Sequence, residues 1–112
     1  MTLLLSRRSV AALALCGIAV LASSSAFGEQ RTHTVTIEGM SFSPATLHVK
    51  RGDMVMWVNK DLVPHTVTAS DKSFDSRNIP AGGSWSRTAT RKGTTAYVCA
   101  YHPTMKGTLI VD

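Results

Sequence analysis

The protein is a chain of 112 residues with twelve Lys or Arg against seven Asp or Glu, so its formal net charge at pH 7 is +5. That length allows one small domain. The basic residues are scattered singly or in pairs, with no stripe that interleaves them with aromatic residues, and this distribution excludes an evident nucleic-acid interface.

Residues 1–28 have the composition of an export signal. Arg7 and Arg8 form a basic start, residues 10–22 are a run of 13 apolar residues, and small residues lead up to a cleavage site that we place after Gly28. A membrane-spanning helix needs about 20 apolar residues. We therefore expect a cleaved signal and a periplasmic protein, with membrane attachment only through an uncleaved signal.

Two features of this segment bear on the export route. "SRRSV" resembles a twin-arginine motif, which carries folded proteins across the membrane, so both this route and the general secretory route stay open. Cys16 follows Leu15 and not the small residue of a lipoprotein motif, so we expect Cys16 to be discarded with the signal.

Residues 29–112 then form a single domain with ten Lys or Arg and seven Asp or Glu, a formal charge of +3. Cys99 is the one cysteine that remains, which excludes a disulfide within the chain. An unpaired thiol in an exported protein indicates intermolecular pairing, a reactive thiol or a metal ligand.

Short alternating runs separated by turn residues follow from Arg31 to the end, and none has the 3.6-residue period of a helix. This pattern predicts an all-β sandwich or small barrel of seven to eight strands. In "ATLHV" we expect Ala45, Leu47 and Val49 to point inward. Residues 70–80 are predicted to be a long connection with one short edge strand around Phe74. The predicted strands are "HTVTI" (33–37), "ATLHV" (45–49), "MVMWVN" (54–59), "HTVTA" (65–69), "SWSRTAT" (84–90), "TTAYVC" (94–99) and "GTLIVD" (107–112).

The segment "CAYHPTM" carries soft metal donors at spacings of three. We expect it to be a seven-residue loop between a strand that ends at Cys99 and a strand that opens at Gly107. A thiolate, an imidazole and a thioether, supplied by Cys99, His102 and Met105, suit copper, and a second histidine would complete a blue-copper ligand set. His65 in "VPHTV", at the entry to a strand 34 residues before Cys99, is the candidate.

These motifs resemble those of the cupredoxins, most closely the amicyanin and plastocyanin group. The resemblance runs from about residue 33 to 112 and includes "LHVKRGDMVMWVN", "PHTV", "SFDS" and "GTTAYVCAYHPTMKGTLIV". It implies a Greek-key β-sandwich in which His65, Cys99, His102 and Met105 bind one type 1 copper ion.

The resemblance also implies a function. Cupredoxins of this kind are monomeric electron carriers and not enzymes, and they exchange single electrons with transient protein partners such as a dehydrogenase, a c-type cytochrome or a reductase. The histidine of the loop, here His102, reaches the surface in these proteins and would be the route for the electron.

Two positions depart from the family pattern. The residue after the first histidine is often asparagine, which ties the two ligand loops together, and here it is Thr66. The family pattern also has bulky apolar residues near Arg87 and Ala89, so we expect the strand "SWSRTAT" to be less well buried.

Other classes of protein fit the same residues less well. A copper-binding or chaperone module would use the same donors but would favour exposed, exchangeable coordination. Methionine fits a structural zinc site poorly. A cysteine hydrolase would pair Cys99 with His65 or His102, but nothing in the sequence resembles an oxyanion hole. A buried free cysteine would leave the neighbouring donors as coincidence.

Overall fold

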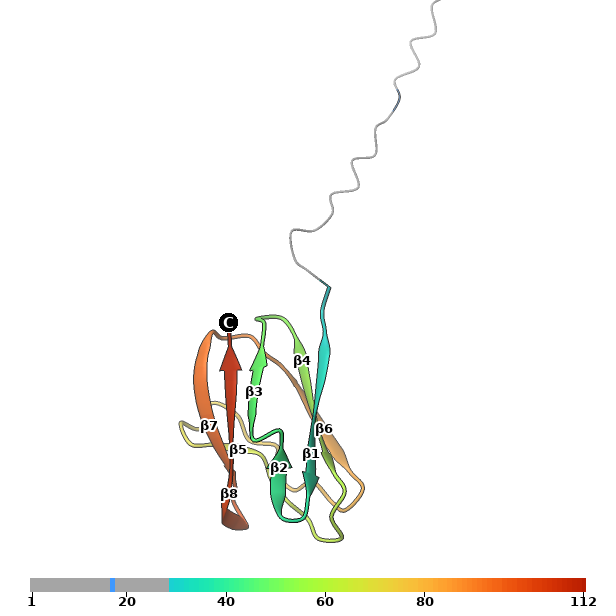
Figure 1. The fold of residues 1–112 in the computed structure, drawn as a ribbon, viewed down its shortest axis with the longest axis vertical. Coiled ribbons are helices and arrows are strands. Elements are labelled where there is room, and N and C mark those ends of the chain that lie inside the picture. Colours follow the sequence, from blue (N-terminus) through green and yellow to red (C-terminus); the bar gives the residue numbers. More distant parts are fainter. Residues whose placement is uncertain (1–16, 18–28) are drawn as a thin grey trace, which may run out of the picture.

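A computed structural model describes residue 17 and residues 29–112, and the expected signal at 1–28 otherwise lies outside the described residues. The described part is all-β, with no helix long and apolar enough to cross a membrane. Its strands are β1 (Thr32–Glu38), β2 (Ser41–Ser43), β3 (Thr46–Val49), β4 (Met54–Asn59), β5 (Thr68–Ala69), β6 (Ser84–Thr88), β7 (Gly93–Cys99) and β8 (His102–Val111), as Figure 1 shows.

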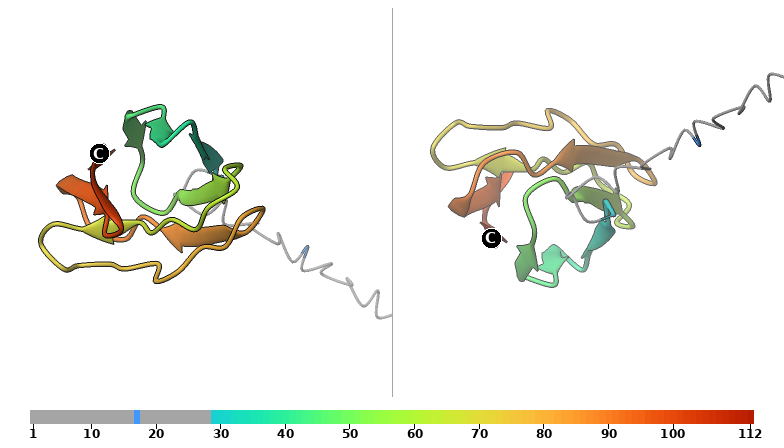
Figure 2. Two further views of the ribbon diagram at one scale, coloured as in Figure 1. Left: turned by 90° about the horizontal axis from the view of Figure 1, so that it is seen from below. Right: turned by 90° about the horizontal axis from the view of Figure 1, so that it is seen from above.

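The eight strands form two four-stranded sheets in the orders β2-β1-β4-β6 and β3-β8-β7-β5. Most neighbouring strands are antiparallel, but β1 pairs with β4 and β3 pairs with β8 in parallel. Seen from its two ends in Figure 2, the molecule has its strands arranged around a common interior. The expected Greek-key β-sandwich of the cupredoxin type is confirmed.

The core lies between the sheets and is built from the inward residues of alternating strands. In β4 every second residue is buried, and Trp57, with no exposed surface, lies at the centre. Its ring meets the Tyr97 ring edge to face at a centroid distance of 5.7 Å, a favoured aromatic geometry. Trp57 is thus a core aromatic residue, as the alternation predicts.

A glycine completes the packing around Tyr97. Gly107 of β8 lies opposite Tyr97 of β7, and a Cβ atom at Gly107 would collide with the Tyr97 ring. The ring therefore occupies the space above a residue without a side chain, which explains why β8 holds a glycine in its middle.

Several details of the sequence prediction were wrong. Ala45 is exposed, because β3 begins only at Thr46, where its pairing with β8 starts. Phe74 is buried but lies in no strand, since the only pairing nearby is an isolated bridge between Thr68 and Asp75. Of the predicted strand 65–69 only β5 (Thr68–Ala69) forms, and β2 was not predicted at all.

The last strand also begins earlier than expected. It starts at His102 and not at Gly107, because His102 already pairs with Cys99 across a two-residue turn. The pairing then shifts, and the next pair along the ladder joins Val98 to Lys106. The three residues from Pro103 to Met105 therefore form an irregularity within β8, and most of the expected loop belongs to this strand.

Candidate metal centre

Three side chains meet at the end of the sandwich where β7 turns into β8. His65, Cys99 and His102 each place one donor atom so that all three atoms lie within 4.8 Å of one another. Within residue 17 and residues 29–112 this is the only group of three His, Cys, Asp or Glu side chains so arranged. The sequence analysis had predicted all three residues as metal ligands, and the structure brings them together across 37 positions of the chain.

The strand pairing explains how these residues meet. Cys99 is the last residue of β7 and His102 the first residue of β8, and the two residues are paired across the turn. His65 lies just before β5, the neighbour of β7. Its backbone exchanges two hydrogen bonds with Ile79, at 3.1 and 2.8 Å, which fix the segment that carries the ring.

The His65 ring has no exposed surface, and its two nitrogens have different surroundings. Its Nε2 lies 2.8 Å from Oδ2 of Asp61, and its Nδ1 lies 3.6 Å from Sγ of Cys99. A carboxylate only accepts hydrogen bonds, so Nε2 carries the ring proton and donates a hydrogen bond to Asp61. This tautomer leaves the lone pair on Nδ1, directed toward the sulfur.

Asp61 is a residue of this site that the sequence analysis did not single out. Its carboxylate accepts hydrogen bonds from the backbone N–H groups of Gly39, at 2.7 Å, and Met40, at 3.0 Å. The Met40 bond, with the contribution of His65 next, lowers the pKa of Asp61 below its ordinary value. Asp61 therefore stays ionised and links the turn between β1 and β2 to the His65 ring.

Buried Asn59 holds the segment that carries Asp61 and His65. Its side-chain oxygen accepts a hydrogen bond from the N–H of Asp61 at 3.0 Å. Its amide nitrogen donates to the backbone carbonyls of Val63, at 2.9 Å, and Ile79, at 3.1 Å. A fully buried amide satisfied in this way rigidifies its surroundings. The sequence carried a signal for Asn59 and Asp61, because the Asn-Lys-Asp turn at residues 59–61 ends four residues before His65.

The departure at Thr66 does not break the tie between the two ligand segments. The N–H of Thr66 donates to Sγ of Cys99 at 3.3 Å, and Oγ1 of Thr66 accepts the N–H of Ala100 at 2.7 Å. Thr66 is buried, so both bonds are shielded from water. The threonine hydroxyl thus joins the two ligand segments.

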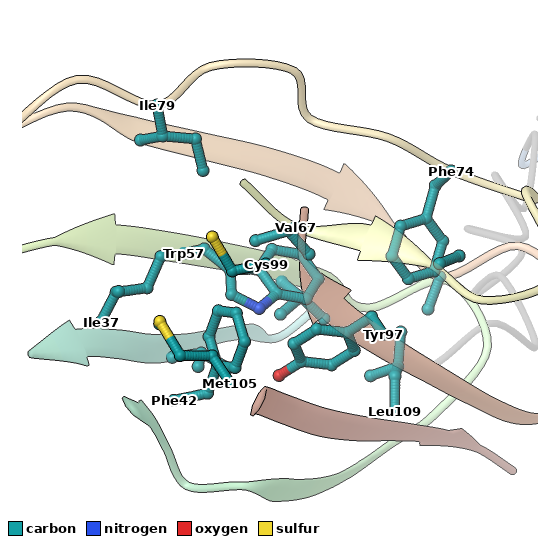
Figure 3. Packing of buried hydrophobic residues seen from close by; sticks show 14 of the residues in the cluster. Ile37, Phe42, Trp57, Val67, Phe74, Ile79, Tyr97, Cys99, Met105 and Leu109 are labelled. Atoms are coloured by element: carbon teal, nitrogen blue, oxygen red, sulfur yellow. The ribbon is translucent and has the colours of Figure 1, made fainter. Parts of the chain in front are cut away.

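His102 and Met105 complete the neighbourhood. Nδ1 of His102 lies 3.7 Å from Sγ of Cys99, and its ring is half-buried. Met105 is buried with 3% of its surface exposed, and Figure 3 shows it at the same end of the core as Cys99, away from Phe74 and Leu109. His102 therefore borders solvent, whereas Met105 is buried at the same end of the core.

These residues fit a soft metal ion. Both Nδ1···Sγ separations, 3.6 and 3.7 Å, are close to those of two donors that share one ion at about 2.0 to 2.3 Å from each. The donor set that copper prefers consists of two imidazoles and one thiolate, with a thioether as a weaker donor. His33 and His48 lie outside the group.

Comparisons with known proteins agree with this geometry. The model of the cupredoxin-like domain family matches residues 10–111. Amicyanin of Paracoccus denitrificans is 32% identical over 83 residues, which cover 70% of this chain and 63% of the length of that protein. The chain therefore spans less than two thirds of this relative.

Solved structures give the same result. The structure of an amicyanin mutant in the Cu(I) form superposes with a TM-score of 0.68 at 31% identity, covering 72% of this chain and 82% of the other. The copper-containing nitrite reductase of Thermus scotoductus SA-01 superposes with a TM-score of 0.69 at 28% identity, but only 23% of that enzyme is covered. On the family match, the amicyanin relative and the shared fold, this chain belongs to the cupredoxin-like family and is similar to the amicyanins.

Proposed function

We propose that this protein is a small blue copper protein that carries single electrons between protein partners in the periplasm. The observation that supports it most is the convergence of His65, Cys99 and His102 within 4.8 Å at one end of a cupredoxin fold. His65 and His102 would hold the ion through Nδ1, Cys99 through its sulfur, and Met105 would be the weak axial ligand. Copper, when bound, supplies the one-electron couple between Cu(II) and Cu(I).

The surrounding residues keep this donor set in one arrangement. Asp61 fixes the tautomer and orientation of His65, and Thr66 ties the Cys99 segment to the His65 segment. The two copper oxidation states prefer different coordination geometries, so a frame that allows neither to relax reduces the rearrangement that accompanies electron transfer. A rigid, buried frame favours a carrier over an exchangeable copper-binding or chaperone module.

The surface beside His102 suits short-lived protein encounters. Leu62 is 95% exposed and Tyr101 50%, and Val63 and Met40 are each 42% exposed. Leu62 and Tyr101 are next to Asp61 and His102 in the chain, Met40 donates a hydrogen bond to Asp61, and Val63 lies two residues from His65. An apolar rim around a half-exposed ligand fits the small contact of a redox encounter. We propose that a dehydrogenase, a c-type cytochrome or a reductase docks here on the monomer.

The remaining elements of the proposal concern location and chemistry. We propose that residues 1–28 are a cleaved export signal and that the domain of residues 29–112 therefore lies in the periplasm. There the cytosolic thiols that would compete with Cys99 for copper are absent. The protein would act without transforming a substrate, because each residue of the site is used to hold the ion or to expose its ligand, and none is placed to transfer a proton to a bound molecule.

The test is to add one equivalent of Cu(II) to the purified protein and to record the visible absorption spectrum. We expect an intense blue band from the thiolate–copper bond that disappears with a mild reductant and returns on reoxidation. A pale spectrum with readily removed copper would contradict the carrier and favour a copper-handling module. An intense spectrum that cannot be cycled would contradict electron transfer while leaving the ligand set intact.

A further inference from the structure

A second feature of the molecule lies at the end of the sandwich opposite the metal centre. Between the end of β6 and the start of β7 the surface is hollowed by a cavity of about 290 Å³. Figure 3 shows Phe74 and Leu109 at this end of the core, far from Cys99 and Met105. The lining of the cavity includes Phe74, Arg87, Ala89, Arg91, Leu109 and Val111.

The floor of this cavity is apolar. Phe74 and Val111 each expose 7% of their surface, Leu109 exposes 3% and Ala89 exposes 2%. β6 is the edge strand of its sheet, and Arg87 in this strand and Ala89 just after it line the cavity. Arg87 is half-buried, as the sequence analysis expected, whereas Ala89 is buried.

The rim of the cavity is cationic. The Arg87 guanidinium stacks over the Phe74 ring at 4.9 Å from the centroid. In the part of the chain that the structure describes, no carboxylate lies within ion-pair distance of it. Stacking leaves the N–H edges of a guanidinium free to bind an anion in a bidentate manner. Arg87 is therefore held in place by the ring with its charge unmatched.

Arg91 adds a second positive charge at the rim. It contacts Asp71 at 3.2 Å through one nitrogen, and this pair is exposed. The other oxygen of Asp71 accepts the N–H of Ser73 at 2.9 Å. Of the two arginines only Arg91 is thus paired with a carboxylate, and Ser73, Thr90 and Thr95 add hydroxyl groups to the lining.

We infer that this cavity binds a small carboxylate with a short apolar tail. The carboxylate would pair with Arg87 and Arg91 at the rim, and the tail would cover Phe74, Leu109 and Val111 on the floor. The volume lies at the lower end of ligand sites, which limits the tail to about six carbons. This inference does not depend on the proposed function, because no residue of the cavity belongs to the metal centre.

The test uses hexanoate as the probe and the ¹⁵N-labelled protein, both without added metal and loaded with Cu(I). We expect saturable shifts of the amide resonances around Ser73, Phe74 and residues 87–95 in both forms. Acetate, which lacks the tail, and hexanol, which lacks the charge, should each bind at least tenfold more weakly. Shifts confined to His65 and His102 would overturn the inference, because they would place the probe on the metal ligands.

The matched variants are Arg87→Gln and, as a control that removes the same charge outside the cavity, Arg77→Gln in the connection between β5 and β6, where the neighbouring Asn78 accepts a hydrogen bond from Tyr101. We expect Arg87→Gln to weaken hexanoate at least about tenfold, as the loss of a charge-assisted hydrogen bond predicts, and Arg77→Gln to change it less than twofold. Arg91→Gln is the second test, with a smaller expected loss. Equal effects of Arg87→Gln and Arg77→Gln, or no effect of either arginine at the rim, would overturn the proposal.

Discussion

The protein pairs a histidine with an aspartate twice, once at each end of the sandwich. His65 meets Asp61 at 2.8 Å and His33 meets Asp53 at 2.9 Å, in both pairs through Nε2 and Oδ2. The two pairs differ in what lies beyond the imidazole. His65 is fully buried with Nδ1 facing Cys99, whereas the side chain of His33 is 26% exposed and belongs to no donor group. Of the two pairs, only that of His65 and Asp61 therefore has a third donor facing the free nitrogen, as the proposed metal site requires.

The Asp53 pair has a structural role. The carboxylate accepts hydrogen bonds from the backbone N–H groups of Arg31, at 3.2 Å, and Lys50, at 3.1 Å, besides His33. The bond from His33, followed by that from Lys50, lowers the pKa of Asp53 from 3.8 to about 2. Asp53 thus joins the start of β1 to the turn before β4. Its charge holds these segments together at this end of the molecule.

Removing the sulfur of Cys99, which faces both His65 and His102, should have the largest effect on the copper spectrum. In Cys99→Ser we expect the intense visible band of the copper-loaded protein to disappear, because the band arises from the bond between thiolate and copper. The control is His33→Gln at the other end, which should keep the band at full intensity. An intense band in Cys99→Ser would show that Cys99 is not the ligand.

Asp61 and Asp53 give the sharpest contrast between the two pairs. Asp61→Asn removes the charge that orients His65, and loss of such a partner typically weakens metal binding by about 10- to 100-fold. Asp53→Asn removes the same charge from the other pair and should leave copper affinity unchanged. Competition with a chelator of known affinity measures both. Equal losses in the two variants would mean that the effect comes from the fold and not from the orientation of His65.

A smaller effect is expected at the axial position. Met105→Leu keeps an apolar side chain of similar volume but removes a weak donor that favours Cu(II). We expect the variant to retain copper and its reduction potential to rise by about 60 mV, which corresponds to a tenfold shift toward Cu(I). Met56→Leu in β4 is the matched control and should leave the potential unchanged. An unchanged potential in Met105→Leu would remove Met105 from the ligand set.

The two ends also differ in how far the sequence predicted them. The sequence analysis singled out Cys99, His102 and Met105 because one short segment carries three soft donors, and His65 because this proline-preceded histidine stands at the predicted entry to a strand. The strands with strict alternation, such as β4, were predicted nearly to the residue. These features are local, so the residue types and their spacing are enough to reveal them.

Features that depend on contacts between distant segments were not predictable. Asp61 has the composition of an ordinary turn residue, and its role follows only from the approach of Gly39 and His65. The start of β8 depends on the pairing of His102 with Cys99, and the exposure of Ala45 on where β3 meets β8. Nothing in the sequence near His33 indicates that Asp53, twenty residues later, is its partner.

The smallest expected effect concerns acid stability, and it tests whether Asp53 stabilises the fold by its charge. Because the pKa of Asp53 in the folded protein, about 2, is below its ordinary value of 3.8, the unfolded chain binds this proton more tightly than the folded one. The stabilisation is therefore fully present above about pH 5 and is lost as the pH falls toward 2.

Asp53→Asn lacks this proton-binding group, so the difference in unfolding free energy between the original protein and the variant should be constant above about pH 5 and should shrink between pH 4 and 2. Urea unfolding of the metal-free proteins across this range measures the difference, and the lowered pKa values of Asp61 and Asp71 cancel because both proteins contain those residues. A difference that stays constant down to pH 2 would mean that Asp53 acts through the shape of its hydrogen bonds alone, and the contrast between the two histidine–aspartate pairs would then rest on the metal donors and not on charge.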